Sequence, residues 1–203
     1  MVERIGIFGG AFNPVHNGHL SVASSFLESN LIHSLWLIPT ADPPHKTDSL
    51  APFRHRLKML EIAFYDWDRI EINDLESRLE NPSYTLRTVT HLQDSYDDRL
   101  FYLCMGEDSL SRFSGWYKYE ELLQRACLLV AERPGYDKRA VPEKILNRTI
   151  FVEHEPVDIS STDIRKTNTG GDESGADTGK KLPDSIHQYI AANALYKDQF
   201  TTR

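Results

Sequence analysis

Short apolar runs alternate with amphipathic segments along most of the 203-residue chain. The runs predict buried strands, and apolar positions three to four residues apart predict helices. The predicted strands span 4–8, 35–38, 69–73, 100–105, 128–131 and 149–152. The predicted helices span 18–30, 53–64, 83–92, 120–125 and 183–195. This alternation predicts an α/β fold, Rossmann-like, whose mainly parallel sheet carries helices on both faces.

The carboxyl ends of the predicted strands carry glycine, proline and polar residues. They read Gly9-Gly10, Pro39-Thr40, Gly106-Glu107-Asp108 and Glu132-Arg133-Pro134-Gly135. Ligands of open parallel sheets bind beyond this edge, so we expect the functional site there. We also expect Ser83 to be the N-cap of its helix. The length predicts one domain over 1–203, and the Gly-, Asp-, Ser- and Thr-rich stretch 167–181 predicts a mobile loop.

Composition narrows the class of protein. The formal net charge of -7 argues against broad binding to nucleic acid, although local donors can still hold a small anion. Cys104 and Cys127 are far apart and are expected to be free thiols. No apolar run approaches the ~20 residues of a membrane helix, and the apolar N-terminal stretch is too short for a signal peptide. We therefore expect a cytoplasmic protein without a membrane partner; a homo-oligomer stays open.

The stretch GGAFNPVHNGHL, from Gly9 to Leu20, joins the first predicted strand to the first helix. A glycine-rich turn followed by a helix N-terminus exposes backbone amides and is typical of an anion site. His16 and His19 add donors that take up positive charge near neutral pH, which suits a phosphate chain. The pair could also share a metal, but no further ligands are evident nearby, so phosphate binding is favoured. The G-x-G-x-x-G dinucleotide fingerprint is absent.

The same stretch resembles the G-G-T-F-D-P-x-H-x-G-H signature of the nucleotidylyltransferase superfamily. More narrowly, the chain resembles bacterial nicotinate-nucleotide adenylyltransferases, because further short motifs follow in the order of that family. They are Ile38-Pro39, Pro43-Pro44-His45-Lys46, Pro82-Ser83-Tyr84-Thr85, Met105-Gly106-Glu107-Asp108-Ser109, Trp116-Tyr117, Glu132-Arg133-Pro134-Gly135 and Ile159-Ser160-Ser161-Thr162-Asp163-Ile164-Arg165. Each motif is weak alone, but their joint occurrence along nearly the whole chain is specific.

The resemblance implies transfer of the adenylyl group of ATP to nicotinate mononucleotide, which gives deamido-NAD and pyrophosphate in NAD biosynthesis. It implies catalytic contacts from His16, His19, Lys46 and Arg165, with His19 as the first choice. The ATP-binding residues that it implies are Gly9, Gly10, Ala11, Phe12, Gly18, Gly106, Asp108, Arg133, Ser161 and Thr162. Mg²⁺ is expected to enter with ATP, held by the phosphates more than by a protein cage.

For the acceptor, the resemblance implies a site at Ser83, Tyr84, Thr85, Trp116 and Tyr117. Trp116 would stack on the pyridine ring or pack in the core. Amides around Thr85 and Tyr117 would receive the carboxylate, and a nicotinamide would set donor against donor there. Two roles stay open: Asp108 contacts a ribose hydroxyl or caps the next helix, and Arg133 contacts adenosine or only ends a strand.

Two positions depart from the family pattern, because Ala11 stands where threonine is common and Asn13 where aspartate is common. These changes affect the detailed phosphate geometry more than the existence of the site. Alternative acceptors are nicotinamide mononucleotide and phosphopantetheine. A nucleotide-binding protein without catalysis is a further alternative, against which His16, His19 and Arg165 argue.

Overall fold

The computed structural model describes residues 2–43, 50–133, 135–169 and 181–196. Within these ranges a six-stranded sheet has the order β3-β2-β1-β4-β5-β6, and every neighbouring pair is parallel. The strands are β1 (Glu3–Gly10), β2 (Ser34–Pro39), β3 (Ile70–Ile72), β4 (Arg99–Gly106), β5 (Cys127–Glu132) and β6 (Thr149–Glu153). The predicted parallel Rossmann-like sheet is therefore confirmed.

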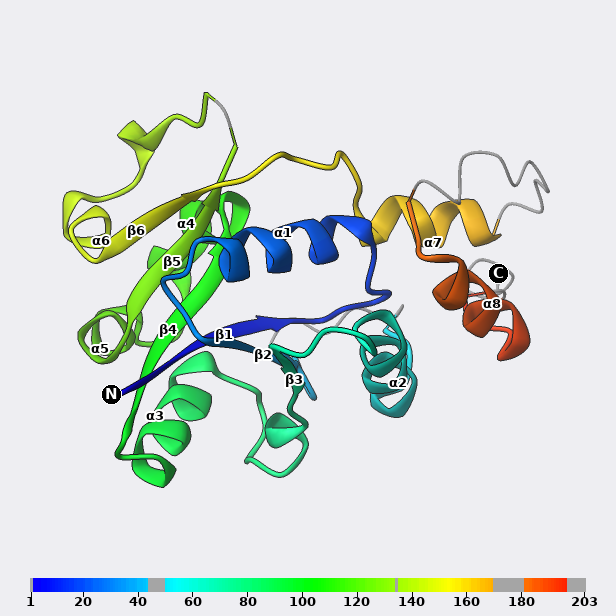
Figure 1. The fold of residues 1–203 in the computed structure, drawn as a ribbon, viewed down its shortest axis with the longest axis horizontal. Coiled ribbons are helices and arrows are strands. Elements are labelled where there is room, and N and C mark those ends of the chain that lie inside the picture. Colours follow the sequence, from blue (N-terminus) through cyan, green and yellow to red (C-terminus); the bar gives the residue numbers. More distant parts are fainter. Residues whose placement is uncertain (1, 44–49, 134, 170–180, 197–203) are drawn as a thin grey trace.

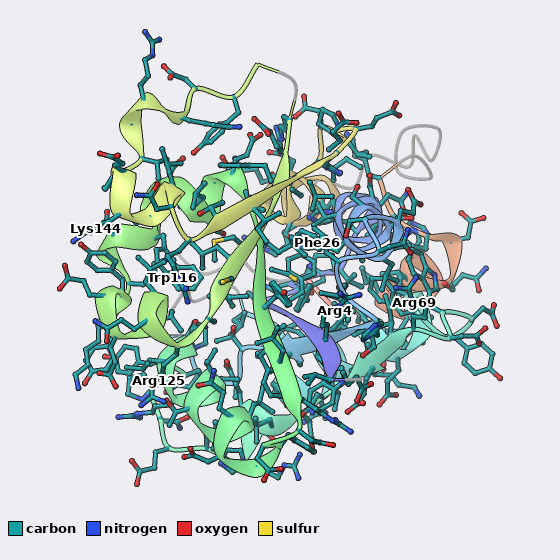
Figure 2. All side chains as sticks on the ribbon, turned by 60° about the vertical axis from the view of Figure 1, so that its left-hand side comes forward. Arg4, Phe26, Arg69, Trp116, Arg125 and Lys144 are labelled. Atoms are coloured by element: carbon teal, nitrogen blue, oxygen red, sulfur yellow. The ribbon has the colours of Figure 1, made fainter. Side chains whose placement is uncertain are left out.

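Helices cover both faces of this sheet (Figure 1). They are α1 (Asn17–Glu28), α2 (Phe53–Ala63), α3 (Thr85–Ser95), α4 (Glu107–Arg112), α5 (Tyr119–Arg125), α6 (Glu143–Leu146), α7 (Ser161–Thr169) and α8 (Asp184–Ala192). The first face is packed by α1, α2, α7 and α8, and the second by α3, α4, α5 and α6. In Figure 2 the labelled Phe26 lies on the α1 side, and Trp116 lies on the side of α5.

The side-chain alternation of the central strand builds both cores. Along β1, Ile5 and Ile7 point into the second core, while Phe8 points into the first. Gly6 also faces the first core, where an added Cβ would lie 2.7 Å from the Cys104 Sγ and 2.7 Å from the Ile32 Cδ1. The central strand is thus buried on both faces, which explains its continuous apolar sequence.

The strand order reverses between β1 and β4, which are neighbours in the sheet. The helices that follow these two strands, α1 and α4, pack on opposite faces. In open α/β sheets this arrangement leaves a crevice beyond the carboxyl ends of the two strands, where ligands bind. Gly10 ends β1 and Gly106 ends β4, so both glycine motifs flank the crevice.

The structure also bears on smaller details that the sequence predicts. Ser83 is not the N-cap of α3, because Tyr84 holds that position and the Ser83 Oγ instead accepts from the Asp42 N–H at 3.1 Å. Helix α7 extends to Thr169, so 167–169 are helical and not loop, whereas 170–180 lie outside the described residues. Cys104 and Cys127 are free thiols, as expected. In the described ranges, no helix is long and apolar enough to cross a membrane.

Candidate functional site

The turn between β1 and α1 is packed by aromatic rings. Phe12 is buried at a left-handed φ of 46°, and its ring meets the Phe8 ring edge-on with centroids 5.7 Å apart. The Phe12 ring also lies 5.0 Å from the His19 ring. Gly9 and Gly10 belong to the extended end of β1, and an added Cβ at Gly9 would meet only the Ile38 carbonyl oxygen at 3.9 Å. The backbone at Gly9 is therefore open to a close ligand.

His16 and His19 are brought together at the first turn of α1. His16 is the N-cap of the helix, and the two imidazole centroids are 3.8 Å apart. The His16 backbone N–H donates to the His19 Nδ1 at 3.2 Å. Because Nδ1 is an acceptor in this bond, neutral His19 carries its proton on Nε2. His19 is thereby set as a neutral donor.

Burial keeps both imidazoles neutral in the free protein. It lowers the pKa of His16 to about 4. It also lowers the pKa of His19 well below its usual value, with a smaller contribution from repulsion by His16. Desolvation disfavours the charged form of a histidine, so the pair supplies dipolar donors and not positive charge at neutral pH.

His16 is only 7% exposed, and its Nδ1 finds no hydrogen-bond partner among the described residues. A buried polar atom of this kind costs free energy unless a ligand or water satisfies it. The neighbouring Gly18 leaves room for this ring, since an added Cβ would lie 3.0 Å from that Nδ1. The His16 Nδ1, at the start of α1, is therefore available to hydrogen-bond a ligand or water.

The start of α7 adjoins the same turn. The Ser161 hydroxyl donates to the Pro14 carbonyl at 3.0 Å, and an Arg165 Nη1 donates to the Asn13 carbonyl at 2.8 Å. Figure 1 shows α7 beginning beside the start of α1. The first turns of α1 and α7, far apart in sequence, therefore meet at the turn that follows β1.

The hydroxyls at the start of α7 are already engaged in hydrogen bonds within the protein. Ser160 caps the helix by accepting from the Asp163 N–H at 3.1 Å. The Ser161 hydroxyl holds the turn, and the Thr162 Oγ1 accepts from Arg165 at 3.3 Å. In the free protein, Ser161 and Thr162 thus support the turn and Arg165 through their hydroxyls.

A second group of predicted residues lies where β4 ends. Gly106 is the N-cap of α4, and an added Cβ there meets nothing within 4 Å. Asp108 does not cap this helix, since Gly106 does, and its side chain is exposed. The Glu107 carboxylate accepts from the Arg133 N–H. The exposed Arg133 lines a groove of about 760 Å³ between α1 and the ends of β5 and β6.

The predicted acceptor residues are partly assembled. The rings of Tyr84 and Tyr117 stack with centroids 4.2 Å apart, which places the start of α3 beside the segment before α5. Thr85 is the first residue of α3, and Trp116 is partly buried, with its ring centroid 5.4 Å from that of Phe113. First-turn amides of a helix have no intrahelical acceptor, so the start of α3 offers donors to an anion. Ser83 is occupied in joining the loop after β2 to this region.

Two residues that sequence reasoning did not single out for such roles organise this site. Arg56, buried in α2, donates to the Ala11 and Thr40 carbonyls at 2.8 Å each and to the Ala51 carbonyl at 2.9 Å. The Asn13 side chain accepts from the Ala51 N–H at 3.0 Å. Both join the loops after β1 and β2. Lys46, the predicted phosphate contact in the second loop, lies outside the described residues.

The 321456 order of parallel strands, the glycines at the switch point and the histidine pair at a helix start define a Rossmann-like nucleotide-binding protein. The chain belongs to the cytidylyltransferase-like family, whose model matches residues 7–167. That match begins within β1 and ends within α7, so it covers the glycine-rich turn, the histidine pair, the end of β4 and Arg165.

Curated relatives share most of the chain. A nicotinate-nucleotide adenylyltransferase of Bacillus subtilis is 34% identical over 97% of this chain and 100% of its own length. A probable nicotinate-nucleotide adenylyltransferase of Thermotoga maritima is 36% identical over 81% of each chain. The solved structure of Plasmodium falciparum nicotinic acid mononucleotide adenylyltransferase complexed with NaAD matches with a TM-score of 0.81 and 25% identity, over 96% of this chain and 97% of that one.

Proposed function

We propose that the chain transfers the adenylyl group of ATP to nicotinate mononucleotide, giving deamido-NAD and pyrophosphate. One observation carries this proposal. The neutral His16–His19 pair follows the turn that Arg165 bonds through the Asn13 carbonyl, and this turn lies at the switch point of the sheet. The near full-length similarity to nicotinate-nucleotide adenylyltransferases supports the same reaction. The function belongs to NAD biosynthesis.

The chemistry needs positioning more than a protein nucleophile. The phosphate of the mononucleotide is an anion that attacks the α-phosphorus of ATP, and pyrophosphate leaves. Donors that strengthen their contact as charge shifts onto the leaving oxygens lower the barrier. The His19 Nε2–H and the Arg165 guanidinium supply such donors, and the open backbone at Gly9 lets the phosphates approach.

Neutral histidines suit this role. Placing phosphate charge beside His16 favours its protonated form, so ATP binding raises the pKa of His16 from its lowered value in the free protein. His19 stays a neutral donor, because its Nδ1 accepts from the His16 N–H and cannot carry a proton at the same time. The unpaired Nδ1 of His16 obtains a partner at the same time.

Magnesium enters with ATP in this proposal, since phosphate oxygens are the ligands it prefers, and neutralises part of their charge. In the described part of the chain, no group of three or more His, Cys, Asp or Glu side chains is placed to hold a metal ion. Lys46 is proposed as a further cation near the reacting phosphates. Gly106, Asp108 and Arg133 are proposed to contact adenosine.

The acceptor site favours the acid over the amide. We assign the pyridine ring to Trp116 and the nicotinate carboxylate to the first-turn amides of α3, beside the Tyr84–Tyr117 stack. A carboxylate accepts from those N–H groups, whereas the NH₂ of a nicotinamide opposes one of them and leaves it unsatisfied.

Pyrophosphate release by the purified protein, with ATP and magnesium, tests the reaction. Nicotinate mononucleotide, nicotinamide mononucleotide and phosphopantetheine are compared as acceptors, and the dinucleotide is identified by chromatography. The greatest turnover is expected with nicotinate mononucleotide, and none without an acceptor. Faster turnover of either other acceptor would overturn the assignment.

The acid preference has its own test at Thr85. Proline is tolerated at the first position of a helix, and Tyr84 before it is extended, so Thr85→Pro removes one amide with little strain. Thr85→Ala is the matched control, because it removes the same hydroxyl but keeps the amide. The ratio of kcat/KM for the acid to that for the amide should fall about tenfold in Thr85→Pro and stay unchanged in Thr85→Ala. Equal ratios in the two variants would refute the amide contact.

A further inference from the structure

Asn13 is held from three distant parts of the chain. Its side-chain Oδ1 accepts from the Ala51 N–H at 3.0 Å and from the Tyr196 hydroxyl at 2.9 Å. Its backbone carbonyl accepts from Arg165 at 2.8 Å. Because the Ala51 amide can only donate, the atom facing it is the oxygen of Asn13 and not the nitrogen. Asn13 thereby fixes the turn that lies between the end of β1 and His16.

Tyr196 brings the end of the described chain into this network. It lies beyond α8 and is 5% exposed. Its backbone adopts a left-handed φ of 68°. Burial raises the pKa of its phenol, which therefore stays protonated and donates. Asn13 and Tyr196 are both buried, so their hydrogen bond is shielded from water.

We infer that Tyr196 is a positioning residue for the ATP side of the reaction and that it acts through Asn13. The inference rests on the proposed function. The hydroxyl of Tyr196 and the amide of Ala51 together fix the orientation of the Asn13 side chain, and the same residue presents its carbonyl to Arg165. Arg165 and His16, on either side of this turn, are the proposed phosphate contacts.

The departure from the family pattern fits this role. An aspartate here would offer carboxylate oxygens to the same two donors. Asn13 keeps an acceptor for both donors and removes the charge. A neutral acceptor holds a phenol less strongly than a carboxylate does. In this chain the hydrogen bond therefore joins two neutral groups. Removal of the Tyr196 hydroxyl takes away one of the two donors to the buried Asn13 Oδ1 and leaves the Ala51 N–H as the other.

The test compares two tyrosines of the C-terminal segment. Tyr196→Phe removes the hydroxyl that reaches Asn13. Tyr189→Phe is the matched control, because its hydroxyl bonds the His55 Nδ1 of α2 at 3.0 Å and does not reach the turn. Tyr196→Phe should lower kcat/KM for ATP about tenfold and weaken ATP binding in calorimetry, with KM for the acceptor within about twofold. Tyr189→Phe should change none of these.

A double-mutant cycle shows whether the effect passes through Asn13. In an Asn13→Ala background, Tyr196→Phe should cause no further loss of kcat/KM for ATP. Additive losses, or equal effects of Tyr196→Phe and Tyr189→Phe on ATP binding at matched thermal stability, would overturn the inference. ATP binding is measured without acceptor, so a wild-type protein that binds ATP but transfers nothing would refute the proposed function while still deciding the role of Tyr196.

Discussion

At the residue scale, the chemistry depends on which atoms of two imidazoles carry protons. The bond from the His16 N–H to the His19 Nδ1 fixes the His19 tautomer, and burial keeps the ring neutral. A fixed neutral donor needs no reorganisation when the charge on the phosphates moves, and such preorganisation is the usual source of electrostatic catalysis.

Loss of this donor should reduce turnover strongly. In His19→Ala, kcat for pyrophosphate release is expected to fall about a hundredfold, because one charge-assisted contact in the transition state is worth ~3 kcal/mol. The exposed His187 of α8 is the control, and His187→Ala should keep the wild-type rate. Steady-state kinetics at saturating substrates measures both, and an unchanged kcat in His19→Ala would remove His19 from the mechanism.

The buried His16 predicts a loss of stability in mild acid. Its pKa is lowered to about 4 in the folded protein from 6.5, so between these values the unfolded chain binds more protons than the folded one. Stability is full above pH 6.5 and is lost as the pH falls toward 4. The free energy of unfolding, measured with urea, should fall between pH 7 and pH 5 in both proteins. The fall should be about 2 kcal/mol smaller in His16→Asn than in the wild type. Burial lowers the pKa of His19 and of His154 in both proteins, so the difference between the proteins reports His16 and its repulsion of His19. Equal losses would contradict the buried neutral state of His16.

At the element scale, β1 contains glycines with two different purposes. Gly6 allows close packing of β1 in the first core, whereas Gly9 keeps the backbone at the strand end open. Sequence alone shows both as glycines beside apolar residues. Only the neighbours that fold against each of them, such as Ile32 and Cys104 at Gly6, separate a packing requirement from a ligand-binding one.

Alanine substitutions along β1 should separate these purposes. Gly6→Ala places a Cβ within 2.8 Å of three side chains and should destabilise the protein by about 2 kcal/mol. Gly9→Ala meets one atom at 3.9 Å and should leave stability within about 0.5 kcal/mol while weakening ATP binding about tenfold or more. Chemical denaturation and calorimetry measure the two quantities. The reverse pattern would exclude a phosphate path along the end of this strand.

Elements of the fold were predictable because their signals are local. Apolar runs marked every strand of the sheet, and the motif around residue 161 falls at the start of α7. The predicted cap at Ser83 was wrong because its hydroxyl meets the Asp42 amide, a contact across two loops that no local pattern contains. Helix α7 likewise continues to Thr169 in spite of polar residues that are typical of loops.

At the scale of the whole molecule, the site is built from segments that are far apart in sequence, and sequence spacing does not reveal the contacts between them. Ser161 reaches Pro14 across 147 positions, Arg165 reaches Asn13 across 152, and Tyr196 reaches Asn13 across 183. The resemblance to a family located the histidines and Arg165. It did not reveal that buried polar side chains bind these loops together, because Arg56 sits in an ordinary amphipathic helix.

Arg56 is the side chain that connects the loops around the site. Its guanidinium donates to carbonyls of the loop after β1, the loop after β2 and the approach to α2, so it bonds three segments at once while 1% exposed. Burial lowers its pKa, yet the planar fork still matches several carbonyls in a way that a lysine ammonium does not. The charge also adds positive potential beneath the loop that is proposed to meet the phosphates.

Replacement by lysine tests this link while keeping the charge. Arg56→Lys should lower the free energy of unfolding by about 3 kcal/mol, because buried carbonyls at Ala11, Thr40 or Ala51 lose their donor. Arg54→Lys, on the exposed side of the same helix, should change it by less than about 0.5 kcal/mol. Urea denaturation measures both. If the charge alone mattered, Arg56→Lys would match the wild type in stability and ATP affinity, and the multidentate bonding would then have no energetic role.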